Sequence, residues 1–183
     1  MKVILNIFII ALLVSINFAI GQTTNIIKDN SQFFPMNVGN YWVYSNSHYP
    51  NRNIDTIKIT KKETIGSDIG YLYNMGFLME RNDSVFQFQN KRNGTLYISL
   101  LYFPSDKPIR YALLYAEDTL CWRTVTKLKD SYKVKGKEYF NCYKFTQVFQ
   151  GNDESIIISR GIGIIEFKLA KKEDRLLIDY KIE

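Results

Sequence analysis

Apolar and polar residues alternate with a period of two in several segments of the chain. The clearest case is the segment 175–182, where one side of an extended strand would carry Leu176, Ile178, Tyr180 and Ile182. The segments 56–60 and 84–90 alternate in the same way. Because successive side chains of a strand point to opposite faces, this pattern is typical of β-strands. No stretch after residue 21 shows the pattern of a capped helix.

Turn residues separate the alternating segments at short intervals. Asn93-Gly94 and Gly136 are each typical of a tight hairpin, and Gly66 and Gly151 indicate further turns. The segment 103–108 reads as a loop, because proline cannot serve a central strand. The segment 95–103 is apolar on both faces, which predicts a central strand covered on both sides.

These patterns predict an all-β fold of roughly ten antiparallel strands. With no helices to cover it, a flat open sheet of that size is not a stable arrangement. The alternatives are a strongly curled sheet, a barrel or a two-layer sandwich. The segment 34–183 is expected to form one such domain.

The segment "SRGIGIIEF" contains the glycines Gly161 and Gly163, and Gly-x-Gly occurs in phosphate-binding loops. Such a loop needs a helix after it, whose N-terminal amides face the anion. The residues after Gly163 alternate as in a strand instead. The two glycines are therefore expected to let one strand bend sharply into the next, or to allow close backbone packing.

The N-terminal residues 1–21 have the pattern of an export signal. Lys2 precedes an apolar run, and Ala19-Ile20-Gly21 resembles a cleavage site. We expect a signal peptide over 1–21, a flexible leader over 22–33, and a periplasmic or extracellular location. The formal net charge of +6 then indicates solubility, with no nucleic-acid partner expected.

The two cysteines, Cys121 and Cys142, are a candidate disulfide in an oxidising compartment. The alternative is two buried thiols on strands, since only the strand register decides whether they meet. The hairpin at Gly136 would by itself place Cys142 near Lys129 or Asp130.

Few residues suggest catalysis or metal binding. His48 is the single histidine and lies in a polar segment, so neither a metal site nor a cofactor is expected. Glu80 and Glu166 lie nearest to apolar strand residues and are therefore the carboxylates of most interest for catalysis. The alternative is that both side chains are structural or exposed. No catalytic residue is assigned, and a hydrolase with an unrecognised carboxylate site stays an alternative.

Two further surfaces are candidates for binding. Five lysines occupy the segment 127–137, which indicates either the solvated face of an edge hairpin or a patch for anionic polysaccharide or lipid headgroups. Aromatic residues are spread over many strands. Most are expected in the core, but in a curled sheet some could line a cavity for an apolar or sugar ligand.

Two short motifs resemble a loose group of exported bacterial all-β proteins with no established function. The first is Gly39-x-x-Trp42-x-Tyr44 near the mature start, and the second is the Gly161-Ile162-Gly163 bend near the end. Where the group carries Ala-Pro before the bend, this chain has Ser159-Arg160. The resemblance implies an antiparallel β fold of the cell envelope and no catalytic residue.

The sequence thus favours an exported, non-enzymatic β protein that acts as a binding or interaction module. The first alternative is a carrier of a hydrophobic ligand inside a curled sheet. The partner, whether an envelope protein, a polysaccharide or an apolar small molecule, is left open by the sequence.

Overall fold

The computed structural model describes residues 32–47, 54–74, 76–90, 96–116, 119–149, 151–169 and 173–183. These residues form strands joined by turns and loops. The strands are β1 (Tyr41–Asn46), β2 (Ile54–Ile65), β3 (Asp68–Tyr73), β4 (Gly76–Arg81), β5 (Ser84–Asn90), β6 (Leu96–Tyr102), β7 (Ile109–Ala116), β8 (Thr119–Lys127), β9 (Tyr132–Val134), β10 (Lys137–Tyr139), β11 (Cys142–Phe149), β12 (Asn152–Ser159), β13 (Gly163–Leu169) and β14 (Glu173–Lys181). The all-β prediction is confirmed, with more strands than the roughly ten expected. No helix in the described part of the chain has the length and hydrophobicity to cross a membrane.

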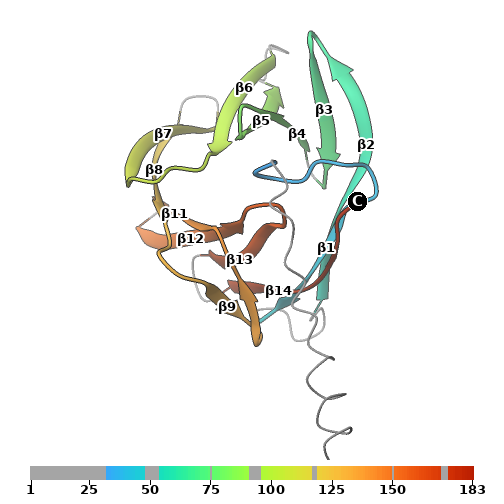
Figure 1. Cartoon of the computed structure of the whole chain (residues 1–183). Coiled ribbons are helices and arrows are strands. Elements are labelled where there is room, and N and C mark those ends of the chain that lie inside the picture. The colour runs from blue at the N-terminus through green and yellow to red at the C-terminus, as the bar shows by residue number, and fades with distance from the viewer. Residues whose placement is uncertain are drawn as a thin grey trace, which may run out of the picture.

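Twelve of the strands form one antiparallel sheet that curls into a nearly closed barrel (Figure 1). Its strand order is β6-β5-β4-β3-β2-β1-β14-β13-β12-β11-β8-β7. The first and last strands, β1 and β14, pair with each other in the middle of this order. The remaining strands, β9 and β10, form a separate hairpin inserted between β8 and β11.

The predicted turns are confirmed where the structure describes them. Gly66, Gly136 and Gly151 all have positive φ in hairpin turns, while the turn at Asn93-Gly94 lies outside the described residues. Positive φ suits glycine because a Cβ would clash with the backbone there. The segment 103–108 connects β6 to β7 without strand structure, as its prolines predicted.

The Gly161 and Gly163 prediction is also confirmed. Both residues have positive φ, at 76° for Gly161 in the turn after β12 and 98° for Gly163 at the start of β13, and no helix follows them. A Cβ on Gly163 would lie 3.1 Å from Trp42 Nε1 and 3.3 Å from a ring carbon of Phe34. The glycine therefore serves both a bend and a close approach.

The residues of the two short motifs meet at this bend. The Trp42 indole N–H donates to the Ile162 carbonyl at 2.5 Å, and the Tyr44 hydroxyl donates to the Ile164 carbonyl at 2.8 Å. Both aromatic side chains are fully buried, so these bonds satisfy polar groups that burial would otherwise leave unpaired.

The segment before β1 runs across the inside of the curled sheet (Figure 1). Phe33 and Phe34 are buried, and their rings lie against Tyr143 and Trp42 at centroid distances of 5.5 and 5.6 Å. Phe33, expected as the last residue of the leader, thus packs with the domain.

The regular alternation predicted for 175–182 is wrong at one point. Val43 pairs with Asp179, but the next residue, Tyr44, pairs with Leu177, so Ile178 is the extra residue of a β-bulge. The bulge shifts the inward face by one position, and Leu177 is fully buried.

The central position predicted for 95–103 is wrong as well, because β6 is an edge strand. The sheet curls until β6 faces β7, the other edge, and the two strands are joined by side chains. The Tyr111 hydroxyl donates to the Leu101 carbonyl at 2.6 Å, and the Phe103 and Tyr111 rings lie 4.8 Å apart. This contact lies at the end of β6, while Ile98 of the same strand is 43% exposed.

Candidate functional site

The predicted disulfide is absent from this structure, in which Cys121 and Cys142 are separate buried thiols. They lie on the paired strands β8 and β11, but at opposite ends of the pairing. Gln147 pairs with Arg123 near Cys121, while the Leu128 amide donates to the Cys142 carbonyl at the other end. The Gly136 hairpin therefore sets Cys142 beside Leu128, one residue from the predicted neighbour.

Burial raises the pKa of the Cys142 thiol to about 11. At neutral pH the side chain is consequently a thiol rather than the thiolate that acts as a nucleophile.

Glu80 positions the chain segment that enters the barrel. One of its carboxylate oxygens accepts the backbone N–H groups of Phe33 and Phe34 at 2.8 and 3.2 Å. Burial raises the pKa of the Glu80 carboxyl, against the lowering effect of these two bonds. The geometry gives Glu80 a structural task.

Glu166 is nearly buried and forms a polar cluster with two side chains. Tyr132 donates to one carboxylate oxygen at 2.9 Å, and the Lys168 ammonium lies 2.9 Å from the other. Tyr132 belongs to the β9–β10 hairpin, so this cluster fastens the hairpin to the barrel. Glu80 and Glu166 are thus engaged in separate structural contacts.

The remaining sequence candidates give no catalytic or metal arrangement. His48 lies outside the described residues. Within the described ranges, no group of three His, Cys, Asp or Glu side chains is placed to hold a metal ion. The lysines of segment 127–137 are exposed; Lys127 pairs with Asp106 at 2.6 Å, and Lys137 donates to the Ile178 carbonyl at 3.0 Å.

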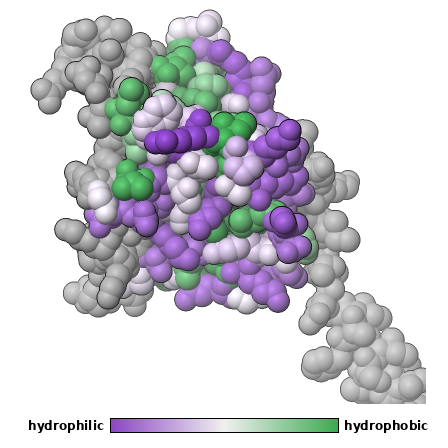
Figure 2. Space-filling model, turned by 90° about the vertical axis from the view of Figure 1, so that its left-hand side faces the viewer, coloured by the Kyte–Doolittle hydropathy of each residue, from purple (hydrophilic) through white to green (hydrophobic). Residues whose placement is uncertain are grey.

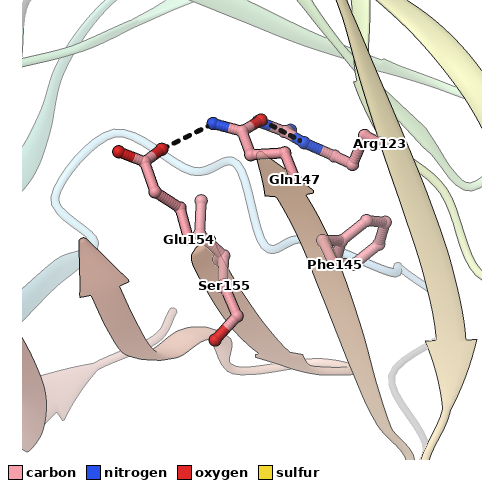
Figure 3. A pocket seen from close by; sticks show the side chains of 6 residues that line it. Arg123, Phe145, Gln147, Glu154 and Ser155 are labelled. Atoms are coloured by element: carbon pink, nitrogen blue, oxygen red, sulfur yellow. Dashed lines mark hydrogen bonds between the residues drawn. The ribbon is translucent and has the colours of Figure 1, made fainter. Parts of the chain in front are cut away.

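The structure reveals a different polar cluster, inside the barrel, made by Arg123 of β8, Gln147 of β11 and Glu154 of β12 (Figure 3). Register places these residues side by side, because Arg123 pairs with Gln147 and Gln147 pairs with Glu154. They share the inward face of their strands with Phe145 and Val125, which are buried in the core.

Arg123 is only 5% exposed and its guanidinium makes three hydrogen bonds. Nε and Nη2 donate to the Gln147 side-chain oxygen at 3.0 and 2.6 Å, and Nη1 donates to the Leu101 carbonyl at 3.0 Å. The guanidinium also lies 5.1 Å from the centre of the Tyr102 ring. All of these partners are uncharged, although a buried charge ordinarily has a counter-ion.

Glu154 is connected to Arg123 through the side chain of Gln147. The Gln147 amide nitrogen donates to a Glu154 carboxylate oxygen at 2.7 Å, so the neutral amide stands between the positive and the negative group. Among the described residues, neither Arg123 nor Glu154 is within ion-pair distance of an opposite charge. The result is a pair of opposite charges held apart.

A small pocket of about 30 Å³ opens beside the cluster, lined by Arg123, Phe145, Gln147, Glu154, Ser155 and Ile156. A bound water needs roughly 10–15 Å³ of such space, so the volume suits a few waters or the headgroup of a small molecule. Polar groups on one side and Phe145 and Ile156 on the other are a common combination in ligand sites.

Arg123 also joins the two edges of the sheet. The Leu101 carbonyl of β6 accepts from both Arg123 and Tyr111, and β6 and β7 are the two edge strands of the sheet, each paired on one side only. Burial raises the pKa of the Tyr111 hydroxyl, which keeps it protonated and able to donate. The pocket therefore lies near the seam of the barrel.

A second arginine of the sheet, Arg175, is only partly buried and has a carboxylate partner. It belongs to β14 and pairs with Asp55 of β2 at 3.0 Å. Arg123 lacks such a partner in the described structure, which distinguishes the two positions.

The outer face of the same strands carries exposed apolar side chains. Trp122 is 52% exposed, with the Arg110 guanidinium 4.8 Å from its ring centre, and Leu120 and Val148 are also exposed. Figure 2 shows the side of the molecule on the left of Figure 1, where hydrophobic residues form separate patches among hydrophilic ones.

Sequence reasoning missed Arg123, although a signal was available. In the segment "TLCWRTVTK" the period of two puts Arg123 on the same face as Cys121 and Val125. A charged residue in an otherwise apolar series predicts either a buried ion or an exposed strand face. Gln147 and Glu154 give no comparable signal, since polar residues at strand ends are common.

No protein-family model matches the chain, and neither the curated proteins nor the solved structures compared with it show a significant match. The functional argument accordingly rests on the geometry of the site.

Proposed function

We propose that this chain is an exported, non-enzymatic binding module of the cell envelope, and that it binds a small ligand inside its barrel at Arg123. The observation that carries the proposal is the buried guanidinium, which has only uncharged partners beside a pocket. A bound ligand would supply the opposite charge that Arg123 lacks among the described residues.

Binding is favoured over catalysis by the side chains present. The pocket lining contains one carboxylate, Glu154, whereas acid–base hydrolysis of a glycosidic bond needs two facing carboxylates. Neither thiol lines the pocket either. The arrangement offers fixed charges and hydrogen-bonding groups, which serve recognition.

The pocket residues favour a ligand with polar groups over the purely hydrophobic ligand of the carrier alternative. A carrier of a purely hydrophobic molecule would place its ligand against apolar walls, whereas here Arg123, Gln147 and Glu154 line one side. The apolar residues Phe145 and Ile156 leave room for only a short apolar part beside a polar group.

Two observations support export to the cell envelope: the N-terminal signal pattern, and the resemblance carried by the Trp42 and Gly163 motifs. A measurement of the N-terminus of the secreted protein tests it. Export predicts a mature chain beginning at Gln22, and recovery of only the intact Met1 form would contradict it.

Native mass spectrometry of protein isolated from its own cells tests the binding site. We expect a small molecule bound to the wild type and to Trp122→Ala, and its loss from Arg123→Met. If Arg123→Met keeps the ligand, the site is misplaced. If Trp122→Ala alone loses a partner, the outer face is the binding surface instead.

A further inference from the structure

The charges of the pocket constrain which ligand it can take. Arg123 favours an anionic group, but Glu154 lies on the same wall and repels one. A purely cationic ligand meets the reverse difficulty, because Arg123 repels it. Only a ligand with both charges is matched to both side chains.

The Gln147 amide shows the geometry that such a ligand would need. Its oxygen accepts from Arg123 and its nitrogen donates to Glu154, so an acceptor faces one charge and a donor faces the other. An amino-acid headgroup has the same order of groups, with a carboxylate acceptor and an ammonium donor separated by one carbon.

We infer that this pocket binds the headgroup of a small zwitterion, with the ligand carboxylate at Arg123 and the ligand ammonium at Glu154. The inference rests on the proposed function and specifies its ligand class. Each ligand group would meet a group of opposite charge, whereas the Gln147 amide is neutral, and this attraction between charges gives the ligand an advantage over the amide.

The volume of the pocket is sufficient for a zwitterionic headgroup and limits the size of the rest of the ligand. About 30 Å³ accommodates a few heavy atoms, and Phe145 and Ile156 provide an apolar surface beside them. The ligand would therefore be a compact amino acid or a related zwitterion.

Three probes of matched size test the inference on the folded chain by calorimetric titration. Glycine carries both charges, acetate only the negative one and methylammonium only the positive one. We expect glycine to bind about tenfold or more tightly than either of the others. Equal or tighter binding of acetate would overturn the zwitterion and indicate a simple anion site.

Two variants make the test specific to the paired charges. Glu154→Gln removes the negative charge but keeps a side chain of the same shape, so the preference should move from glycine to acetate. Arg123→Met should abolish binding of both. Unchanged glycine binding in Glu154→Gln, or absence of glycine binding in the wild type, would contradict the inference.

The native mass measurement separates this inference from the proposed function. If the co-purified ligand is lost in Arg123→Met but is not a zwitterion, the ligand class is wrong and the binding site stands. If Arg123→Met keeps its ligand, both are wrong.

Discussion

The two ends of the barrel are built from different chemistry. At the end where β1, β11 and β13 begin, Phe33, Phe34 and Trp42 fill the interior and Gly163 lets them pack closely. At the opposite end, where β11 finishes, Arg123 and Glu154 occupy the inner face beside a pocket. We call these the Trp42 end and the Arg123 end.

We expect the two ends to serve different tasks, stability at the Trp42 end and ligand binding at the Arg123 end. Burial of a large aromatic side chain contributes about 1.5–3 kcal/mol, so the Trp42 end carries much of the stabilising contact. A buried charge with uncharged partners adds little net stability, because its desolvation offsets its hydrogen bonds. The Arg123 end is therefore expected to be important for binding while contributing little to the folding free energy.

The two tryptophans give the largest expected difference. Trp42 is fully buried and Trp122 is 52% exposed. Trp42→Ala should lower the free energy of unfolding by about 3–5 kcal/mol through the cavity that it leaves. Trp122→Ala should cost under about 1 kcal/mol. Urea denaturation measures both, and similar losses would show that the Trp42 end is not the stable part.

Alanine substitutions at two glycines with positive φ distinguish the cost of close packing from the cost of backbone strain. Gly163→Ala brings a methyl group against Trp42 and Phe34 and should cost about 2–3 kcal/mol. Gly136→Ala, where a Cβ would meet nothing within 4 Å, should cost about 1 kcal/mol. Melting curves of equal midpoint for the two variants would reject the close packing.

Arg123→Met should cost about 1–2 kcal/mol in urea denaturation, because it removes a desolvated charge but leaves the Gln147 side-chain oxygen without its donor. The matching change at a paired arginine, Arg175→Met, leaves Asp55 without its partner and should cost more. A loss at Arg123 as large as at Trp42 would assign the arginine to the folding core.

The smallest effect concerns Glu80 and pH. Burial raises the pKa of its carboxyl, so the folded chain holds the proton to a higher pH than the unfolded chain. Stability therefore falls as pH rises from the ordinary glutamate pKa of about 4.3 through the raised value.

Glu80→Gln stays neutral while its side-chain oxygen still accepts the Phe33 and Phe34 amides, so this part of the pH dependence should disappear. Denaturation of the wild type and the variant between about pH 4 and about pH 7 measures it, with the exposed Glu63→Gln as the control. Parallel pH profiles for wild type and Glu80→Gln would contradict the assignment.

The fold class was predictable because it depends on local patterns. Alternation and the turns at Gly66, Gly136 and Gly151 are properties of neighbouring residues, and these three turns are found where predicted. The bulge at Ile178 and the edge position of β6 were not predictable, since both depend on how strands far apart in the sequence pair with each other.

The site was less predictable for the same reason. Cys121 and Cys142 were candidates for a bond, yet the β8–β11 register separates them. Arg123, Gln147 and Glu154 come from three strands, and the sequence does not show that they share one face of the barrel. Arg123 alone carried a signal, as a charge within an apolar series.

A nuclear magnetic resonance titration with glycine tests whether the binding site lies inside the barrel at Arg123, since side-chain N–H groups report on each region separately. We expect the resonances of the Arg123 Nε–H and the Gln147 amide group to shift together as glycine binds. The indole N–H resonances of Trp42 and Trp122 should stay in place. A shift at Trp122 with none at Arg123 would contradict the claim that the binding site lies inside the barrel.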